Sequence, residues 1–280
     1  MPFAAAAGHS IAYEWVGEGK PALVFLHEGL GSIRQWRDFP ARVAAATGCR
    51  ALVYDRYGYG QSDVLVEKKR DVRFMHDEAL IALPEFLKNV GVENPLLIGH
   101  SDGASIALIH AGAKHPVRGV VAMAPHVFIE PLCLKSIDVA AEQFEKTDFA
   151  EKLGRYHRDA RKTFYGWADV WLDKNFTTWD IRDDYLPNVG CPVLAIQGYD
   201  DIYGTMTQLD EVKRRVKGPC ELLKLEDCGH APFREQPEKT LEAVTRFLSS
   251  LFTARTSCRA APASAEAPAS PCASTGASGA

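Results

Sequence analysis

Short apolar runs alternate with longer helical patterns along this chain, and this alternation restricts the fold more than any other feature. The runs are rich in Val, Ile and Leu, and most lack the polar residue at every second position that a half-exposed strand would have, so each predicts a buried strand. Buried strands separated by helices predict a mostly parallel sheet covered on both faces. The predicted strands are Ala22–Leu26, Ala51–Tyr54, Leu96–Ile98, Gly119–Met123, Val193–Ile196 and Leu222–Leu225.

The helical patterns between these runs have recognisable limits. Pro84 is expected to kink or restart the second helix, because proline lacks the N–H that a helix interior needs. After Pro237, apolar residues recur at intervals of three and four, which predicts a final amphipathic helix that closes the core. Ile11–Val16 is expected to add an antiparallel edge strand. The first three predicted helices are Trp36–Ala46, Asp77–Val90 and Ser101–Lys114.

The regular spacing breaks once, between Met123 and Val193, where the chain is rich in aromatic residues. A structureless loop of that length is unusual, so a helical insertion that forms a lid over the sheet is expected. The predicted organisation is an α/β core in two parts, residues 1–125 and 188–252, interrupted by a helical lid at 126–187. Residues 253–280 are dominated by Ala, Ser and Pro and are expected to form a disordered tail.

Composition argues against several classes of protein. The chain of 280 residues has a net charge of -4 and no basic cluster, so nucleic acid is not an expected partner. It has no signal-like leader and no apolar run long enough to cross a membrane, which predicts a soluble, cytoplasmic protein. Seven cysteines without a C-x-x-C pair favour reduced thiols over disulfides or a metal site. No metal and no cofactor are expected, and the sequence leaves open whether the chain forms a homo-oligomer.

The strongest chemical motif is Gly99-His100-Ser101-Asp102-Gly103, which follows a predicted strand and precedes a predicted helix. A G-x-S-x-G segment in this context forms a sharp turn, the nucleophile elbow, that raises the serine hydroxyl above the sheet. Ser101 is therefore the predicted nucleophile.

A serine nucleophile needs a base and an acid, which are expected at the carboxyl ends of later strands. His230 follows one predicted strand and is the predicted base. Asp200 and Asp201 both follow another, and Asp201 is favoured as the acid, with Asp200 as the alternative. The catalytic triad is then Ser101, Asp201 and His230, in the order serine, acid, histidine. Cys228 is a weaker candidate for a catalytic thiol.

Attack by a serine creates an oxyanion that two backbone N–H groups should stabilise. One donor is expected from Asp102, directly after the nucleophile. The other should come from the loop that follows the first apolar run, His27-Glu28-Gly29-Leu30-Gly31-Ser32. Gly29 is the assigned donor of this oxyanion hole, with Leu30 or Glu28 as alternatives.

These segments, taken in order, resemble the α/β-hydrolase superfamily. The resemblance extends over Leu26–Ser32, Tyr54–Ser62, the Ser101 elbow, Gln197–Asp201 and Gly229–Pro237. It implies the α/β-hydrolase fold, with an eight-stranded mostly parallel sheet, helices on both faces, a lid after the sixth strand and the triad roles given above. The glycines of the loop at 55–62 lack the phosphate-binding G-x-x-x-x-G-K-[ST] pattern, and the resemblance gives this loop a structural role only.

The chain departs from many relatives at Glu28, where glycine commonly follows the histidine. This carboxylate could receive a cationic substrate group or bond within its own loop. Asp102 raises the same question, because a similar Ser-Asp-Gly elbow occurs in amino-acid ester hydrolases of the superfamily.

The expected function is hydrolysis of a carboxylic ester or thioester of a small to medium apolar substrate through a Ser101 acyl-enzyme. Cleavage of a carbon–carbon bond, a lactone, or an amino-acid ester or peptide would use the same triad. A serine at position 101 argues against dehalogenase or epoxide hydrolase chemistry, which needs a carboxylate nucleophile. The alternative from a different class is a ligand receptor of the same fold that has no catalytic activity.

Overall fold

The structure is a computed structural model, and it describes residues 1–258. One sheet of eight strands runs through it in the order β1-β2-β4-β3-β5-β6-β7-β8. β1 pairs with β2 and β2 with β4 in antiparallel fashion, and every other neighbouring pair is parallel. The strands are β1 Phe3–Ala6, β2 His9–Val16, β3 Ala22–Leu26, β4 Arg50–Tyr54, β5 Leu96–His100, β6 Gly119–Met123, β7 Val193–Gly198 and β8 Cys220–Leu225.

The sheet separates two apolar layers, because successive side chains of a strand point to opposite faces. On β3, Val24 and Leu26 belong to one buried cluster and Leu23 and Phe25 to the other. The parallel strands are therefore buried on both sides, as their nearly continuous apolar sequences predict. The six predicted parallel strands and the α/β-hydrolase fold class are confirmed.

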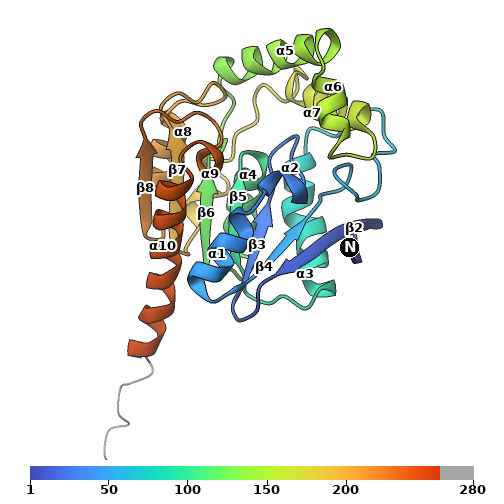
Figure 1. Cartoon of the computed structure of the whole chain (residues 1–280). Helices are drawn as coiled ribbons and strands as arrows, with labels where there is room; N and C mark the ends of the chain where they lie inside the picture. The colour runs from blue at the N-terminus through green and yellow to red at the C-terminus, as the bar shows by residue number, and fades with distance from the viewer. Residues whose placement is uncertain (259–280) are drawn as a thin grey trace, which may run out of the picture.

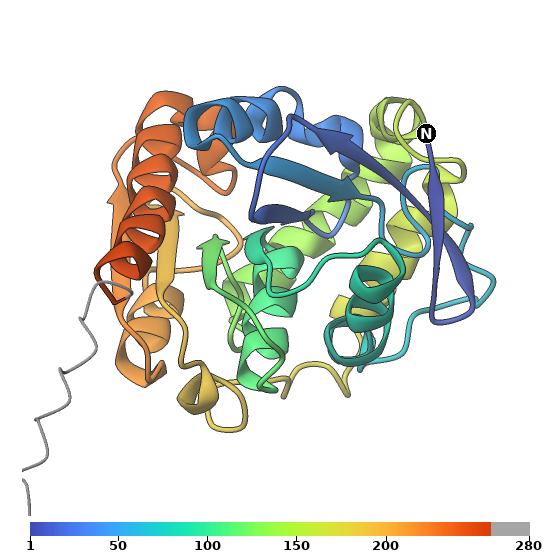
Figure 2. The same cartoon turned by 90° about the horizontal axis from the view of Figure 1, so that it is seen from below.

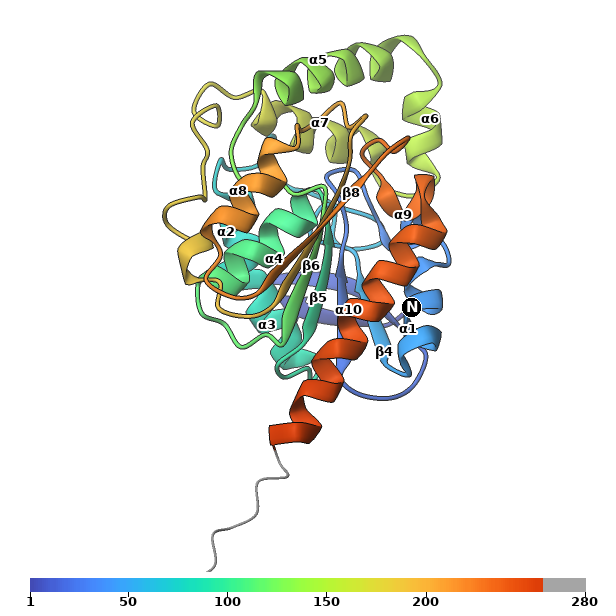
Figure 3. The same cartoon turned by 90° about the vertical axis from the view of Figure 1, so that its left-hand side faces the viewer.

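Helices cover both faces of the sheet. Figure 3 shows α1, α9 and α10 on one side of the strands and α3, α4 and α8 on the other. The core helices are α1 Phe39–Thr47, α2 Phe74–Asp77, α3 Leu83–Asn89, α4 Asp102–Gly112, α8 Thr207–Arg215, α9 Pro232–Glu235 and α10 Pro237–Cys258. Short 3-10 helices span Ile33–Trp36 and Leu186–Asn188.

Between β6 and β7 the chain forms three further helices, α5 Pro131–Lys146, α6 Phe149–Gly154 and α7 Ala160–Trp171. Figure 1 places them together above one end of the strands. Aromatic side chains join these helices, for example Phe144 of α5 and Phe164 of α7, whose rings stack with centroids 4.0 Å apart. The helical content predicted for residues 126–187 is present, and its action as a lid stays a prediction.

The N-terminal edge of the sheet differs from the sequence-based expectation. Ile11–Val16 does lie in an antiparallel strand, β2, but β1 pairs outside it and forms the edge. Figure 2 shows these first strands at the opposite end of the sheet from α10. The segment Phe3–Ala6 was missed because three of its four residues are alanines, which carry little strand signal.

Two helices also differ in detail from the prediction. The helix expected at Asp77–Val90 consists of α2, a π-helical stretch at Glu78–Ala82 and α3, with Pro84 in the first turn of α3. Pro84 therefore lies where the helix changes from π to α, with helical backbone directly before it. α10 continues to Cys258, past residue 253, where the tail was expected to begin. The rest of that tail, 259–280, lies outside the described residues. Among the helices of the described part, none is long and apolar enough to cross a membrane.

Candidate active site

Ser101 lies at the turn between β5 and α4, as the motif predicts. Its backbone has φ 52° and ψ -121°, a conformation that costs a residue with a side chain on the order of 1–3 kcal/mol. The Ser101 N–H donates to the carbonyl oxygen of Met123 at the end of β6, at 2.9 Å, which fixes the turn to the neighbouring strand. A Cβ on Gly103 would lie 2.0 Å from the Leu26 carbonyl oxygen, so only glycine lets α4 start this close to β3.

Asp201 and His230 follow β7 and β8 and meet at the same end of the sheet. His230 Nδ1 lies 2.9 Å from Asp201 Oδ1 and 2.8 Å from Oδ2. Burial opposes the charged form of Asp201, but the charge and hydrogen bond of His230, together with the Tyr203 N–H, lower the pKa of this carboxyl below its ordinary value. Asp200 is exposed and has no comparable contact with the imidazole among the described residues. The geometry therefore favours Asp201 over Asp200 as the partner of His230.

The β7 and β8 loops approach closely enough to form this pair because of Gly198. A Cβ at this position would lie 1.8 Å from the carbonyl oxygen of Cys228. The Asp200 N–H donates to the same Cys228 oxygen at 2.9 Å. Contact between the two loops thus determines the distance between the acid and the histidine.

Ser101 and His230 line one cavity of about 120 Å³. Among the described residues no hydrogen bond joins the Ser101 hydroxyl to His230, and such contacts are often long in enzymes without substrate. Side chains of α5 and α7 form much of the apolar wall. The cavity is lined by the polar residues Glu28, Ser101, Asp102, His126, Tyr203 and His230, the apolar residues Leu30, Cys133, Ile137, Trp167 and Trp171, and Gly29.

Both predicted oxyanion donors border this cavity. Asp102 is the first residue of α4, and the N–H of such a residue has no partner within its helix. Gly29 lies in the loop after β3, and its N–H finds no acceptor within the part of the chain that the structure describes. Two unpaired N–H groups beside a serine hydroxyl are the arrangement that oxyanion stabilisation needs, and their catalytic role stays a prediction.

Glu28 lies against two basic side chains of the protein itself. Its Oε2 lies 3.4 Å from His100 Nδ1 and its Oε1 lies 3.5 Å from Arg234 Nη2. Burial opposes the charged form, but the hydrogen bond and charge of His100 and the charge of Arg234 hold the pKa of Glu28 well below its usual range. His100 Nε2 lies 2.7 Å from the carbonyl oxygen of His230, so this cluster supports the backbone of the predicted base. Both partners come from outside the loop of Glu28, whereas the sequence offered a substrate cation or a bond within that loop as the alternatives.

Asp102, unlike Glu28, has a carboxylate without a close basic partner. Its side chain is only 1% exposed, and neither carboxylate oxygen has a hydrogen-bond partner among the described residues. The nearest cation is Arg56, whose Nη2 lies 3.9 Å from Asp102 Oδ2. Burial raises the pKa of the Asp102 carboxyl, although the charge of Arg56 opposes this. A buried carboxylate without donors lies beside the predicted nucleophile.

His126 is a second imidazole on the cavity wall that the sequence did not single out. It is 3% exposed, its Nδ1 has no partner among the described residues, and its ring centroid lies 5.9 Å from that of His230. Burial, followed by the charge of His230, lowers the pKa of His126 to about 3, so the ring is neutral near pH 7. Its position directly after β6, at the end of the sheet that carries Ser101, was the only sequence signal available.

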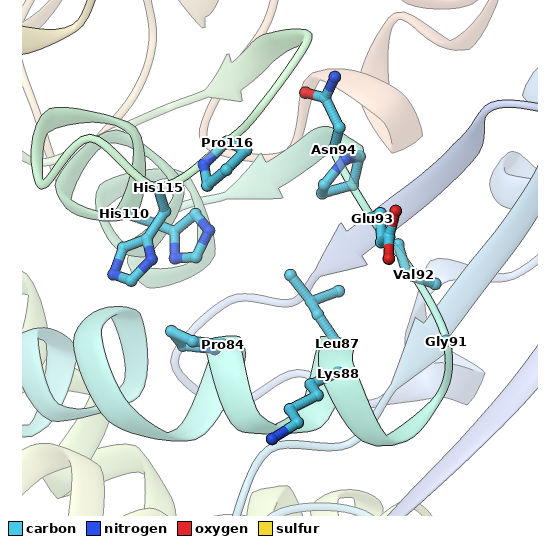
Figure 4. A pocket seen from close by; sticks show the side chains of 11 residues that line it. Pro84, Leu87, Lys88, Gly91, Val92, Glu93, Asn94, His110, His115 and Pro116 are labelled. Carbon is cyan, nitrogen blue, oxygen red and sulfur yellow. The ribbon is translucent and has the colours of Figure 1, made fainter.

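A larger cavity, of about 500 Å³, lies where β5 and β6 begin, at the opposite end of these strands from Ser101 (Figure 4). His110 lies on its wall, with Nδ1 2.8 Å from the Ala79 carbonyl oxygen, and burial lowers the pKa of this imidazole to about 4. No predicted catalytic residue borders this cavity.

The remaining predictions concern thiols and metals. Cys228 is buried, and burial raises the pKa of its thiol to about 11, which disfavours a reactive thiolate. The cysteines at positions 49, 133, 191, 220 and 228 are unpaired. Within residues 1–258 no group of three or more His, Cys, Asp or Glu side chains could hold a metal ion.

Comparison with known proteins identifies the family of the chain. The model of the alpha/beta hydrolase family matches residues 23–243. The chain belongs to the alpha/beta hydrolase family. Among solved structures, the enol-lactonase from Burkholderia xenovorans LB400 has a TM-score of 0.68 and 20% identity, covering 89% of this chain and 100% of that one. At this identity the likeness shows the fold alone.

Curated relatives of this alpha/beta hydrolase are distant. The 3-oxoadipate enol-lactonase 1 of Acinetobacter baylyi is 23% identical over 256 residues, which cover 84% of this chain and 91% of that protein. A phenolphthiocerol/phthiocerol polyketide synthase component of Mycobacterium bovis is 26% identical over 197 residues, or 63% of this chain. That match spans only 10% of the length of the synthase component. These two relatives are named for different enzymatic activities.

Proposed function

We propose that this protein is a serine hydrolase that cleaves a carboxylic ester or thioester of a compact substrate. The proposal depends on one arrangement: the strained Ser101 lines the same cavity as His230. The imidazole of His230 in turn contacts both carboxylate oxygens of Asp201. The cavity volume of about 120 Å³ is below the roughly 300 Å³ at which small-molecule sites usually begin, which favours a short acyl group.

In the proposed reaction the Ser101 hydroxyl attacks the carbonyl carbon while His230 Nε2 takes its proton. Asp201 accepts the hydrogen bond from Nδ1–H and stabilises the imidazolium that forms. The N–H groups of Gly29 and Asp102 stabilise the oxyanion. The intermediate then expels the alcohol or thiol, which leaves with the proton from His230. Water then attacks the acyl-enzyme while His230 takes one of its protons. His230 returns that proton to the Ser101 oxygen as the acid leaves, which restores the free enzyme.

The test is covalent labelling and burst kinetics. A fluorophosphonate probe should label the wild type and not Ser101→Ala, and a p-nitrophenyl acetate assay should show a burst of one equivalent of p-nitrophenol only where Ser101 is present. Ser136→Ala serves as a control, because Ser136 lies on α5 and donates to the Ile202 carbonyl away from the cavity. Equal labelling of Ser101→Ala would falsify the assignment, and no labelling of the wild type would favour a receptor without catalytic activity.

Asp102 favours a second candidate, hydrolysis of an amino-acid ester or peptide. Asp102 lines the cavity, its two carboxylate oxygens are buried there without donors, and a substrate ammonium group that reached them beside the scissile carbonyl would supply the missing hydrogen bonds. Glu28 is a poorer receptor for such a group, because Arg234 and His100 already lie within 3.5 Å of its carboxylate.

The p-nitrophenyl esters of alanine and propionate distinguish the two candidates, because they differ only in the α-amino group. Ammonium binding predicts a higher kcat/KM for the alanine ester, and Asp102→Asn should abolish that preference. Equal rates on both esters in the wild type would exclude this candidate. Lactones and carbon–carbon substrates belong in the same panel, since an enol-lactonase is among the relatives of the chain.

A further inference from the structure

Arg56 is a buried cation directly beside the predicted oxyanion hole. It follows β4, in the loop at 55–62 to which the sequence assigns only a structural role, and it is 2% exposed. Its Nη2 donates to the carbonyl oxygens of His27 at 3.2 Å and Glu28 at 2.9 Å, while its Nε has no partner among the described residues. Burying a guanidinium with so few bonds is costly, so a role beyond packing is worth testing.

We propose that Arg56 is a positioning residue that orients the Glu28–Gly29 peptide and so directs the Gly29 N–H towards the oxyanion. This inference rests on the proposed function, because it concerns the same reaction. A peptide unit is planar and trans, so its C=O and N–H point in opposite directions. A donor that holds the Glu28 carbonyl on one side therefore fixes the direction of the Gly29 N–H on the other.

The backbone of Arg56 adds a second restraint through His27. The Arg56 N–H donates to His27 Nε2 at 3.0 Å, which makes that nitrogen an acceptor and places the imidazole proton on Nδ1. Nδ1 then donates to the Glu28 carbonyl oxygen at 2.7 Å. Burial and the neighbouring charge of Arg56 lower the pKa of His27, which keeps this neutral form near pH 7. Both the main chain and the side chain of Arg56 thus act on one carbonyl.

The same carbonyl also accepts the N–H of Gly31 at 3.1 Å, within the turn itself. That bond moves with the loop and does not relate the loop to the rest of the molecule. The contacts of Arg56 and His27 do so, because they join the loop after β3 to the segment after β4. Removing the Arg56 bond should loosen the Gly29 donor without unfolding the turn.

Arg56 is also related to the second oxyanion donor. Its Nη2 lies 3.9 Å from the carboxylate of Asp102, the residue whose backbone N–H borders the cavity. The guanidinium of Arg56 therefore also offsets the buried negative charge of Asp102. The experiment must separate the two roles.

Three variants separate them. Arg56→Lys keeps the charge and loses the planar donor group, and the double variant Arg56→Met with Asp102→Asn removes both charges together, so neither is left unpaired in the interior. Asp102→Asn alone provides the baseline for the double variant. Arg50→Lys is the matched control, because Arg50 lies at the other end of β4, where its guanidinium stacks on Trp15 at 4.2 Å.

The measurements are kcat and KM on p-nitrophenyl propionate, the inhibition constant of a trifluoromethyl ketone, and the melting temperature. A trifluoromethyl ketone adds to the serine and forms an oxyanion, so its affinity reports on the oxyanion hole. We expect Arg56→Lys to lower kcat by about 10- to 1000-fold, up to the cost of losing one oxyanion donor, with KM changed less than threefold. The affinity for the ketone should fall by the same factor as kcat/KM, and Arg50→Lys should match the wild type.

The double variant decides between the two roles. If Arg56 positions the Gly29 N–H, the loss of Arg56 lowers kcat by a similar factor in both backgrounds. The ratio of kcat between Asp102→Asn and the double variant should then match the ratio between the wild type and Arg56→Lys. The proposal is overturned if the double variant reaches the rate of Asp102→Asn, or if Arg56→Lys keeps the ketone affinity of the wild type. Failure of the proposed function itself is recognised separately, because the wild type would then form no acyl-enzyme at all.

Discussion

Replacing Asp201 by asparagine tests the predicted triad most directly, because the change preserves size and removes one acceptor. Asp201 Oδ1 accepts the Tyr203 N–H at 2.8 Å, so the asparagine oxygen is expected to occupy that position. The NH2 group then replaces Oδ2, which lies 2.8 Å from His230 Nδ1. Nδ1 then faces an NH2 donor at the nearer position and the retained oxygen at 2.9 Å, and repulsion by that donor favours moving the imidazole proton from Nδ1 to Nε2.

In that tautomer Nε2 cannot accept the Ser101 proton, and the imidazolium loses its carboxylate partner. We expect kcat to fall about 10⁴-fold, equivalent to about 5 kcal/mol of transition-state stabilisation. The melting temperature should remain close to that of the wild type, since the shape of the side chain is retained.

The assay is steady-state hydrolysis of p-nitrophenyl propionate, with Asp200→Asn as the matched control. Asp200 is exposed and lies next to Asp201 in the chain, so its variant should stay within a few-fold of the wild type. If Asp201→Asn kept a tenth or more of the wild-type kcat while Asp200→Asn lost activity, the assignment of the acid would be wrong.

Two further predictions concern the elements that hold the site. Gly103→Ala should lower the melting temperature strongly, because its Cβ would lie 2.0 Å from the Leu26 carbonyl oxygen, and an unchanged melting curve would contradict that contact. Asp55→Asn should lower the free energy of urea unfolding by about 1–3 kcal/mol at pH 5, because Asp55 accepts the N–H groups of Ile33 and Gln61 on separate oxygens, at 2.6 and 2.8 Å. Burial raises the pKa of Asp55 to about 6, so the wild type binds this proton more tightly when folded and loses stability as the pH rises through 6. The difference in free energy of unfolding between the wild type and Asp55→Asn should therefore be smaller at pH 7 than at pH 5. A larger difference at pH 7 would contradict this prediction.

The parallel part of the sheet could be predicted because its strands are apolar at almost every position. β1 could not, since Phe3–Ala6 is mostly alanine and forms a strand only because β2 offers it an edge. Secondary structure at such an edge depends on the partner strand more than on local propensity.

The predicted site residues followed from a topological rule, that the carboxyl ends of parallel strands meet at one edge of the sheet. The residues that support them did not follow from any such rule. His157 shows why: its Nδ1 accepts the Gly60 N–H at 2.8 Å and its Nε2 lies 3.0 Å from the Leu30 carbonyl oxygen. These contacts join positions 97 and 127 residues apart, and only the packing of the insertion brings them together.

The sequence left open whether Glu28 or Asp102 could receive a cationic substrate group. Contacts between distant segments, which the sequence does not reveal, distinguish the two residues. Glu28 is half-buried and Asp102 is buried, and both line the cavity. Nothing in their local sequence ranks one above the other as a receptor for a substrate cation. Glu28 lies within 3.5 Å of two basic side chains, whereas Asp102 has a single cation at 3.9 Å and no hydrogen-bond donor among the described residues. A carboxylate that is already neutralised gains little from a substrate ammonium group, while one without donors gains a charge-assisted hydrogen bond. Discrimination between substrates with and without an amino group should therefore depend on Asp102 more than on Glu28.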